Sequence, residues 1–237
     1  MTLTFVALAI AGLGLVLLLV AGPAYRVGLS LEMAFAILRW AAYVGAAGVA
    51  AGLAALVVAR RRNHRAALVL ALAATVVGAV ALVIPYSWQR QARSVPPIHD
   101  ITTDLDNPPA FEAVVPLRAG APNSLERPPM LATQQREGYP DLAPLTLSLP
   151  PERVFNRALD VAERMGWEIA AADQATGRIE ATDTTSWFGF KDDIVVRVTS
   201  WGSGTRVDVR SVSRVGRSDV GTNARRIREF LDALQEE

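Results

Sequence analysis

Three long apolar stretches follow one another in the first 85 residues, and the short loop between the second and the third is strongly basic. The stretches cover residues 3–21, 40–59 and 66–84, and each is close to the ~20 residues with which a helix crosses ~30 Å of hydrocarbon. The pattern predicts a three-helix transmembrane anchor in residues 1–85, with Pro85 closing the third helix.

The orientation of the anchor follows from residues 60–65, which contain four Arg, because basic clusters are retained on the cytoplasmic side. The amino terminus is then cytoplasmic, and residues 86–237 lie on the periplasmic side of a bacterial cytoplasmic membrane. Aromatic residues at the helix ends assigned to the outer face agree with this orientation, since such rings favour headgroups. They are Tyr25, Trp40, Tyr43, Tyr86 and Trp88. The lipid bilayer is thus an expected partner.

A stripe of small residues, Gly45, Gly48 and Gly52, runs along the second predicted helix. Such a stripe lets a neighbouring helix approach closely. That neighbour belongs either to the same bundle or to a partner membrane protein.

The outer region divides into a Pro-rich segment, residues 86–144, and a regular domain, residues 145–237. We expect residues 97–117 to lie docked on the domain and residues 118–138 to be looser, since prolines disfavour long helices. The regular domain reads as strand, helix, four strands, helix, which predicts an α+β fold with an antiparallel sheet of about five strands and two helices on one face. The strands are expected at residues 145–149, 167–171, 178–182, 194–201 and 205–213. One helix is expected to open at Pro150-Pro151 and to end at Gly166, and the other to run from Ser218 or Asp219 onwards.

Charge and cysteine content narrow the function. Residues 1–85 carry six Arg and one Glu, which leaves 18 of the 24 basic and 22 of the 23 acidic residues for the outer region. A mildly acidic domain gains no counterion-release affinity, so we expect no nucleic-acid binding. The absence of Cys excludes disulfides and thiolate chemistry. Neither a Gly-x-Ser-x-Gly nucleophile motif nor a phosphate-binding Gly loop is present, and no cofactor is expected.

Strand alternation predicts one apolar sheet face towards the helices, with Ile179, Ala181, Ile194, Val196, Val198, Val207 and Val209. The opposite face is charged and carries Arg178, Glu180, Arg197, Arg206, Asp208 and Arg210. A mixed-charge face is most often a solvated set of cross-strand ion pairs. Alternatively, Arg178, Arg197, Arg210 and Arg214 bind a small anion or lipid headgroup, or the docked segment covers the face and its Asp residues pair with Arg.

Two further groups carry candidate chemistry. His99, Asp100, Asp104 and Asp106 form the one cluster suited to hold a hard cation or to act as acid and base, although such residues are also common in turns and salt bridges. Trp187, Phe188 and Phe190 lie within four residues and form either a plug in the core or a patch for a partner or the bilayer surface.

Three segments carry a resemblance to a known family. Residues 210–226 (RSVSRVGRSDVGTNARR) are similar to the closing motif of the bacterial and plastid family catalogued as "domain of unknown function 1499", and residues 97–109 (PIHDITTDLDNPP) resemble the opening motif of its membrane-anchored branch. Residues 182–193 resemble its central loop. Shorter members carry a Cys in the opening motif where His99 and Asp100 stand here, so no thiol role is transferred. The resemblance covers residues 95–233 and implies no agreed activity.

Together these features favour a non-enzymatic integral membrane protein that presents a periplasmic α+β module, as an accessory or scaffold subunit binding partner proteins in a membrane assembly. A lipid- or anion-binding envelope module is the first alternative. A metal-dependent hydrolase that uses His99 and the nearby Asp residues is the second.

Overall fold

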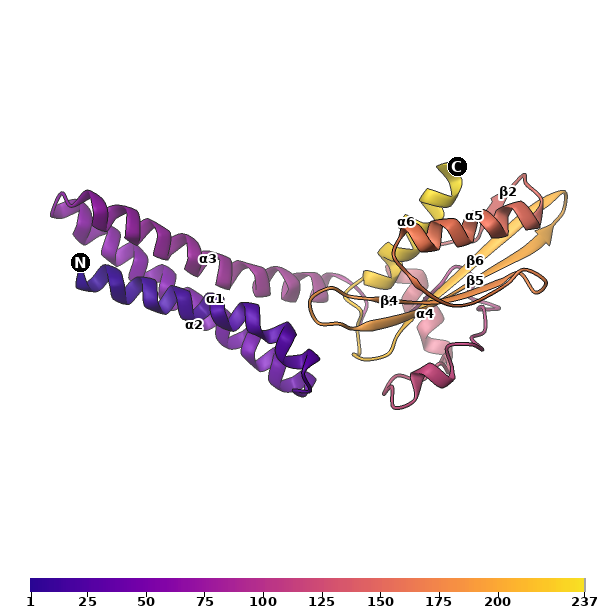
Figure 1. Ribbon diagram of the computed structural model, residues 1–237, viewed down its shortest axis with the longest axis horizontal. Helices are drawn as coiled ribbons and strands as arrows, with labels where there is room; N and C mark the ends of the chain where they lie inside the picture. The colour runs from indigo at the N-terminus through magenta and orange to yellow at the C-terminus, as the bar shows by residue number, and fades with distance from the viewer. Residues whose placement is uncertain (237) are drawn as a thin grey trace. The chain divides into compact units, whose positions relative to one another are not determined.

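The computed structural model describes residues 1–236, and Figure 1 labels its elements. The chain divides into two compact units. The first consists of Met1–Gln91 together with Ser186–Gly189, and the second contains the rest of the described chain.

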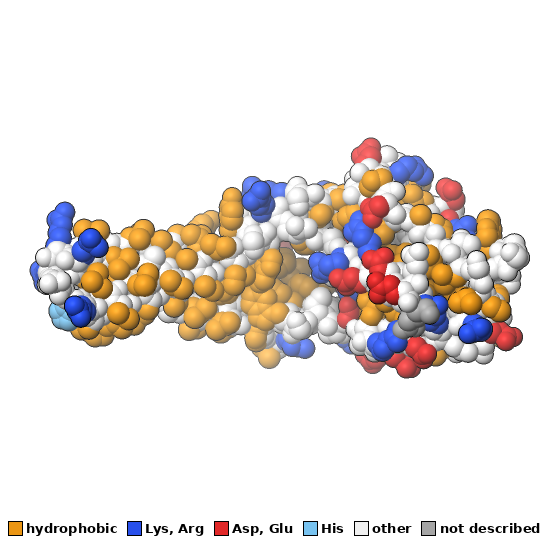
Figure 2. All heavy atoms as spheres, turned by 90° about the horizontal axis from the view of Figure 1, so that it is seen from above, with side chains coloured by type: hydrophobic (Ala, Val, Ile, Leu, Met, Phe, Trp, Pro, Cys, Tyr) orange, Lys and Arg blue, Asp and Glu red, His pale blue; other side chains and the backbone are white. Residues whose placement is uncertain are grey.

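The first unit is built from helices α1 (Thr2–Arg26), α2 (Leu31–Arg61) and α3 (Arg65–Ser94), of which only the last three residues of α3 belong to the second unit. All three helices are long and apolar enough to cross a membrane. Its interior is made of small residues; one packed cluster consists of Ala7, Ala11, Ala55, Ala71 and Ala74. Large apolar side chains such as Phe5, Leu13 and Leu72 are exposed instead, and Figure 2 shows hydrophobic side chains over most of the visible helix surface. A water-soluble bundle buries its large side chains, so this inverted distribution is typical of helices packed in lipid, and the protein is a membrane protein.

The glycine stripe of α2 packs inside this bundle. A Cβ atom added to Gly48 would lie 2.9 Å from Cα of Ala11 in α1. At Gly45 and Gly52 the added atom would lie 2.8 Å from the carbonyl oxygen of Gly78 and 2.4 Å from Oγ1 of Thr75, both in α3. The alternative in which Gly45, Gly48 and Gly52 receive a partner protein is therefore not what the structure shows, because neighbouring helices of the same chain already occupy this stripe.

Each helix is longer than the apolar stretch that predicted it, and Pro85 lies inside α3, so the expectation that Pro85 ends this helix is wrong. Proline lacks an N–H group and disturbs the turn before it, but its own carbonyl still accepts a hydrogen bond. The chain can therefore stay helical beyond Pro85. The hydroxyl of Ser87 donates to the carbonyl of Ile84 at 2.7 Å, which supports the backbone at this point.

The second unit contains a six-stranded antiparallel sheet, so the predicted α+β class is confirmed. Its strands are β1 (Asp100–Thr102), β2 (Leu145–Leu147), β3 (Glu168–Asp173), β4 (Arg178–Thr184), β5 (Lys191–Trp201) and β6 (Gly204–Ser213). The order is β1-β6-β5-β4-β3, and β2 also pairs with β6. Gly202 turns the β5–β6 hairpin with a φ of +57°, a conformation that favours glycine.

Helices α5 (Pro151–Arg164) and α6 (Thr222–Glu236) lie on one side of this sheet (Figure 1). All seven sheet residues predicted to face the helices belong to the same buried core as both helices, which confirms the alternation argument. Within this core Trp167 stacks on Phe230 with ring centroids 5.1 Å apart. Asp219 caps α6, because its carboxylate accepts the backbone N–H of Asn223 at 2.7 Å.

The Pro-rich segment contains more regular structure than expected. Besides β1, it forms the 3-10 turn η1 (Pro116–Arg118) and helix α4 (Pro129–Gly138). The expectation of loose structure in residues 118–138 is thus wrong for α4, where Pro129 occupies the first turn and needs no N–H donor. The side chain of Gln135 in α4 pairs with both backbone groups of Thr102, and so closes the outer edge of β1.

Candidate functional site

The charged sheet face is covered by residues 103–127, which we call the covering segment. Its apolar residues pack against the centre of this face, where Phe111 and Val114 meet Val195 of β5 and Val212 of β6. As a result Glu180, Asp193 and Asp208 are each at most 1% exposed. The interpretation of this face as solvated ion pairs is therefore wrong, since strand alternation identifies a face but not what lies on it.

The buried charges of this face form a network of ion pairs with the covering segment. In its first group, beside β6, Asp100 of β1 lies between two arginines. Arg210 binds the carboxylate of Asp100 through Nε at 3.0 Å and Nη2 at 2.8 Å, and Arg127 of the covering segment donates to the same carboxylate at 2.9 Å. Arg210 also donates to the carbonyl of Leu125 at 2.7 Å. The pKa of Arg127 is lowered by burial, which outweighs the attraction of Asp100. These bonds tie the covering segment to β1 and β6.

Near the β5–β6 hairpin, two carboxylates and two guanidinium groups alternate. Asp104 of the covering segment accepts from Arg197 at 3.0 Å and from Arg206 at 2.8 Å, and both arginines also bind Asp208. Burial alone would raise the pKa of Asp104, but the backbone N–H of Asn107 and the charge of Arg206 hold it below its usual value.

Glu180 in β4 holds the middle of the covering segment. Its carboxylate accepts the backbone N–H groups of Glu112 at 2.9 Å and of Val114 at 3.0 Å. Arg178 pairs with Glu180 at 3.2 Å and forms a bidentate pair with Glu112. A buried carboxylate thus replaces a strand as the hydrogen-bonding partner of this stretch of backbone.

Asp193 in β5 is the centre of the last group of ion pairs. It pairs with Arg118 of the covering segment and with Arg214, which donates through Nη2 at 2.7 Å, and it accepts the hydroxyl of Thr182 at 2.7 Å. Burial tends to raise the pKa of Asp193, but the hydrogen bonds from Arg214, Thr182 and Arg118 outweigh it and hold the pKa below the usual range.

The structure does not bring the four candidate metal ligands together. Asp100 and Asp104 pair with different arginines, while Nδ1 of His99 lies 3.3 Å from the carbonyl of Arg217, and Asp106 is exposed. Within residues 1–236, no three His, Asp or Glu side chains are grouped so that they could hold a metal ion. Likewise the four arginines proposed to bind an anion, Arg178, Arg197, Arg210 and Arg214, all pair with carboxylates.

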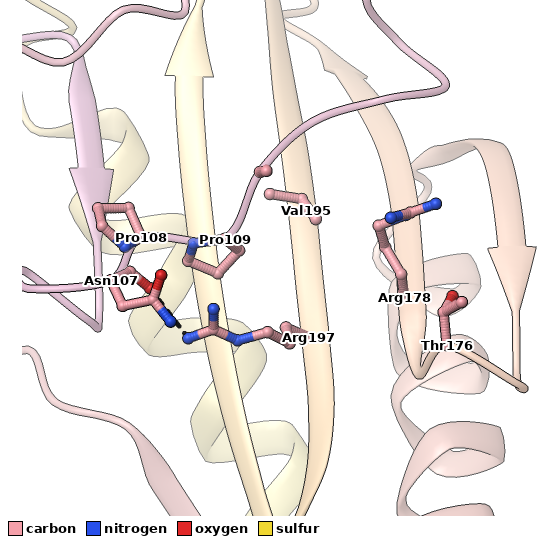
Figure 3. A pocket seen from close by; sticks show the side chains of 8 residues that line it. Asn107, Pro108, Pro109, Thr176, Arg178, Val195 and Arg197 are labelled. Carbon is pink, nitrogen blue, oxygen red and sulfur yellow. Dashed lines mark hydrogen bonds between the residues drawn. The ribbon is translucent and has the colours of Figure 1, made fainter.

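A small cavity of about 220 Å³ opens between the covering segment and strands β4 and β5 (Figure 3). It is lined by Asn107, Pro108, Pro109, Ala110, Thr176, Arg178, Val195 and Arg197. Figure 3 shows Arg197 reaching across to Asn107, whose carbonyl it binds at 3.0 Å. The cavity is smaller than the ~300 Å³ at which ordinary ligand pockets begin.

A second buried network, missed by sequence reasoning, lies on the helix side of the sheet. Arg226 of α6 donates to Asp183 and Asp192 at 2.7 Å each, and Asn223 donates to the carbonyl of His99 at 3.0 Å. Burial raises the pKa of nearby Asp219, against the backbone N–H groups of Gly221 and Asn223. One feature of the sequence indicates this second network. Asp192 and Asp193 are adjacent in a strand, so their side chains point to opposite faces of the sheet, and each carboxylate, once buried, needs a cation on its own face.

The aromatic residues of the central loop fall into different units. Trp187 and Phe188 belong to the helical unit, where Phe188 packs between Tyr25 and Phe35 and is 8% exposed. Phe190 belongs to the sheet unit and is half-buried. Trp187 and Phe188 thus contact residues at the helix ends rather than forming a separate patch.

Residues 100–234 match the family model described as "Protein of unknown function (DUF1499)". No match was found among curated proteins. The matched region runs from β1 to α6 and contains the covering segment and both ion-pair networks. Because the match spans more than half of the chain and includes the central and closing motifs and residues 100–109 of the opening motif, this protein belongs to the DUF1499 family.

Proposed function

We propose that this protein is a non-enzymatic membrane-anchored module that acts by binding, as an accessory or scaffold subunit of a membrane assembly. Its sheet unit would lie on the periplasmic side of a bacterial cytoplasmic membrane, because a basic loop such as residues 60–65, with four Arg, favours the cytoplasmic side.

The observation that carries the proposal is that the carboxylates suited to acid–base catalysis, those of Asp100 and Asp104, are bound by arginines of the same chain. A general acid or base must reach a proton of the substrate, directly or through one water. Asp100 is 1% exposed and bound by two arginines, and Asp104 is bound by two others. These groups hold the covering segment on the sheet, which supports a structural role for them and a binding role for the module.

The open edge of the sheet offers a surface for a partner. At the opposite edge β6 pairs with both β1 and β2, and Gln135 closes β1. In the described part of the chain, β3 pairs with β4 alone. Its middle residues, Ala170, Ala171 and Ala172, have small side chains that leave the backbone accessible, so a partner can add a strand there.

Two matched substitutions test this surface. Ala172→Lys places a long charged side chain on exposed β3, whereas Ala175→Lys places the same side chain three residues away in an exposed turn. After mild detergent extraction and mass spectrometry, we expect Ala172→Lys to lose co-purifying proteins that Ala175→Lys retains. Recovery of the chain alone, with no reproducible companion in the unsubstituted protein, would sink the proposal.

The orientation is tested separately with a reporter fused after the last residue. A reporter that is active only outside the cytoplasm supports the periplasmic location. Activity only in the cytosol would reverse the assignment, whatever partner is found.

A second candidate function rests on the small cavity that Arg178 and Arg197 both line. It would take a small anion, either free inorganic phosphate or a phospholipid headgroup. Arg197→Glu should then abolish binding of phosphate or of anionic vesicles, while Arg153→Glu on the exposed surface of α5 should not. Unchanged binding in Arg197→Glu, or no binding by the unsubstituted protein, rules this candidate out. The carboxylates already paired with both arginines make it the weaker of the two.

A further inference from the structure

Helix α1 has a notch near its carboxyl-terminal end. Gly22 is buried, and a Cβ atom built on it would lie 2.7 Å from Cδ1 and 2.8 Å from Nε1 of Trp187. These distances are too short for any real Cβ atom, so only glycine leaves room for the indole at this place. The notch and the indole both belong to the helical unit.

The residue after the notch supplies a hydrogen-bond acceptor. Pro23 lies inside α1 and has no N–H group, so the carbonyl four residues earlier, that of Leu19, lacks its usual helical donor. An unpaired carbonyl in an apolar setting is costly. The indole Nε1–H of Trp187 donates to this carbonyl at a long distance of 3.4 Å. Gly22 thus leaves space for the indole of Trp187, and Pro23 leaves the Leu19 carbonyl free to accept its N–H.

Contacts from all three helices surround the seated loop. Trp88 of α3 lies against Trp187 with ring centroids 4.9 Å apart, and Phe35 of α2 meets Phe188 edge-on at 5.8 Å. Arg26 of α1 donates from Nη1 to the carbonyl of Ser186 at 3.0 Å. The loop is therefore held by polar and aromatic contacts together.

The position of the notch matches a bilayer interface. Gly22 lies about 30 Å along α1 from its first residue, at 1.5 Å per residue, which is about the thickness of the hydrocarbon layer. Tyr25, Trp88 and other aromatic residues gather at the same helix ends, and Trp and Tyr favour the interface.

We propose that Gly22, Pro23 and the Leu19 carbonyl form a specific seat for the indole of Trp187, and that this seat anchors the loop Ser186–Gly189 at the lipid–water interface. The central loop of the family region is then a membrane-interface element, and α1 is a receptor for it as well as a membrane span. The partner of this loop is the interfacial end of its own helical bundle, not a separate protein.

Paired cysteines test the seat in native membranes, because the natural chain has no Cys. Phe35→Cys with Phe188→Cys replaces two rings that touch, and leaves every contact of Trp187 with α1 in place. A short bifunctional thiol reagent should crosslink this pair within one chain. Phe5→Cys with Phe188→Cys is the control, since Phe5 lies about 25 Å along α1 from Gly22.

The seat is then perturbed in the crosslinkable background. Gly22→Leu should lower the crosslinking yield, whereas Gly12→Leu, on the same helix with open space around its Cβ position, should not. Because Gly22→Leu could also disturb bundle folding, Trp187→Ala provides a second measurement in which the helices are unchanged. It should lower the yield as well.

The carbonyl is tested by a double-mutant cycle. Trp187→Phe removes the indole N–H, and Pro23→Ala returns a backbone donor to Leu19. We expect Trp187→Phe to reduce crosslinking roughly two- to tenfold with Pro23 present and much less with Ala at position 23. Equal yields in the Gly22→Leu and Gly12→Leu proteins, equal crosslinking of both cysteine pairs, or an identical effect of Trp187→Phe in both backgrounds would overturn the seat.

Discussion

The buried carboxylate of Glu180 accepts the backbone N–H of Val114 at 3.0 Å, across 66 residues of sequence. The same carboxylate accepts the N–H of Glu112, so one side chain of β4 serves two backbone donors of the covering segment. No other carboxylate in the network binds the covering segment chiefly through its backbone. These two hydrogen bonds therefore depend on the Glu180 acceptor, whereas the Glu112 side chain adds a separate pair with Arg178.

Glu180→Gln tests this attachment. The amide keeps the size of the side chain but replaces one acceptor oxygen by an NH₂ donor, which must face a backbone N–H. We expect a loss of about 1–3 kcal/mol in the free energy of unfolding and faster amide exchange at residues 112–114. Glu112→Gln is the control, since the Glu112 side chain is 62% exposed. Equal amide exchange in both variants would contradict this role of Glu180.

Removal of a buried charge partner should cost far more than removal of an exposed one. Asp100→Asn leaves Arg210 and Arg127 without their shared carboxylate, and breaking a buried pair typically destabilises by about 3–5 kcal/mol. Asp141→Asn breaks the pair with Arg228, in which both side chains are more than a third exposed, and should cost at most about 1 kcal/mol. Urea unfolding of the full chain in detergent measures both. Similar losses would show that burial does not govern these pairs.

Acid should loosen the covering segment. Asp193 and Asp104 have folded-state pKa values below their unfolded values, so their contribution to stability is present above the unfolded value of about 3.9 and is lost as the pH falls through the folded pKa. Asp219, whose pKa burial raises, acts in the opposite sense: its contribution is largest at low pH and falls as the pH rises through its folded pKa. We expect the net stability to fall below pH 4.

Asp193→Asn isolates one part of this pH dependence. The variant is less stable at pH 7, because Arg118 and Arg214 lose their partner, but its stability should change less between pH 5 and pH 2.5. Unfolding curves at a series of pH values in that range test the slope. If the free energy of unfolding of the variant falls with pH as steeply as that of the natural chain, Asp193 is not a source of the acid sensitivity.

Much of the fold could be predicted because it depends on patterns along the chain. Apolar length alone identifies the membrane helices, and a period of two identifies Val196, Val198 and Val207 as core. The boundary of α3 could not be predicted from Pro85, because proline disturbs only the turn before it and the polar residues that follow can remain helical.

The candidate site was less predictable, because its partners are far apart in sequence. The spacing of Asp100 and Asp104 shows that both carboxylates can act as ligands or pair with cations, but not which groups they meet. Arg210 lies 110 residues beyond Asp100, and Arg206 lies 102 residues beyond Asp104. The charged pattern of β5 and β6 is equally compatible with water and with a covering segment, since either can neutralise alternating charges.

The close approach of α1 and α2 supports a last prediction. A Cβ atom at Gly48 would lie 2.9 Å from backbone Cα of Ala11, which cannot move aside as a flexible side chain can. Gly48→Leu should therefore force the two helices apart and destabilise the bundle by more than the ~1–3 kcal/mol typical of overpacking. Gly12→Leu adds the same side chain to α1 where nothing lies within 4 Å of the Cβ position, and it should leave the bundle unchanged. Thermal unfolding in detergent compares them. If both variants unfold at the same temperature as the natural chain, α1 and α2 do not pack through Gly48, and the stripe is again open to a partner helix.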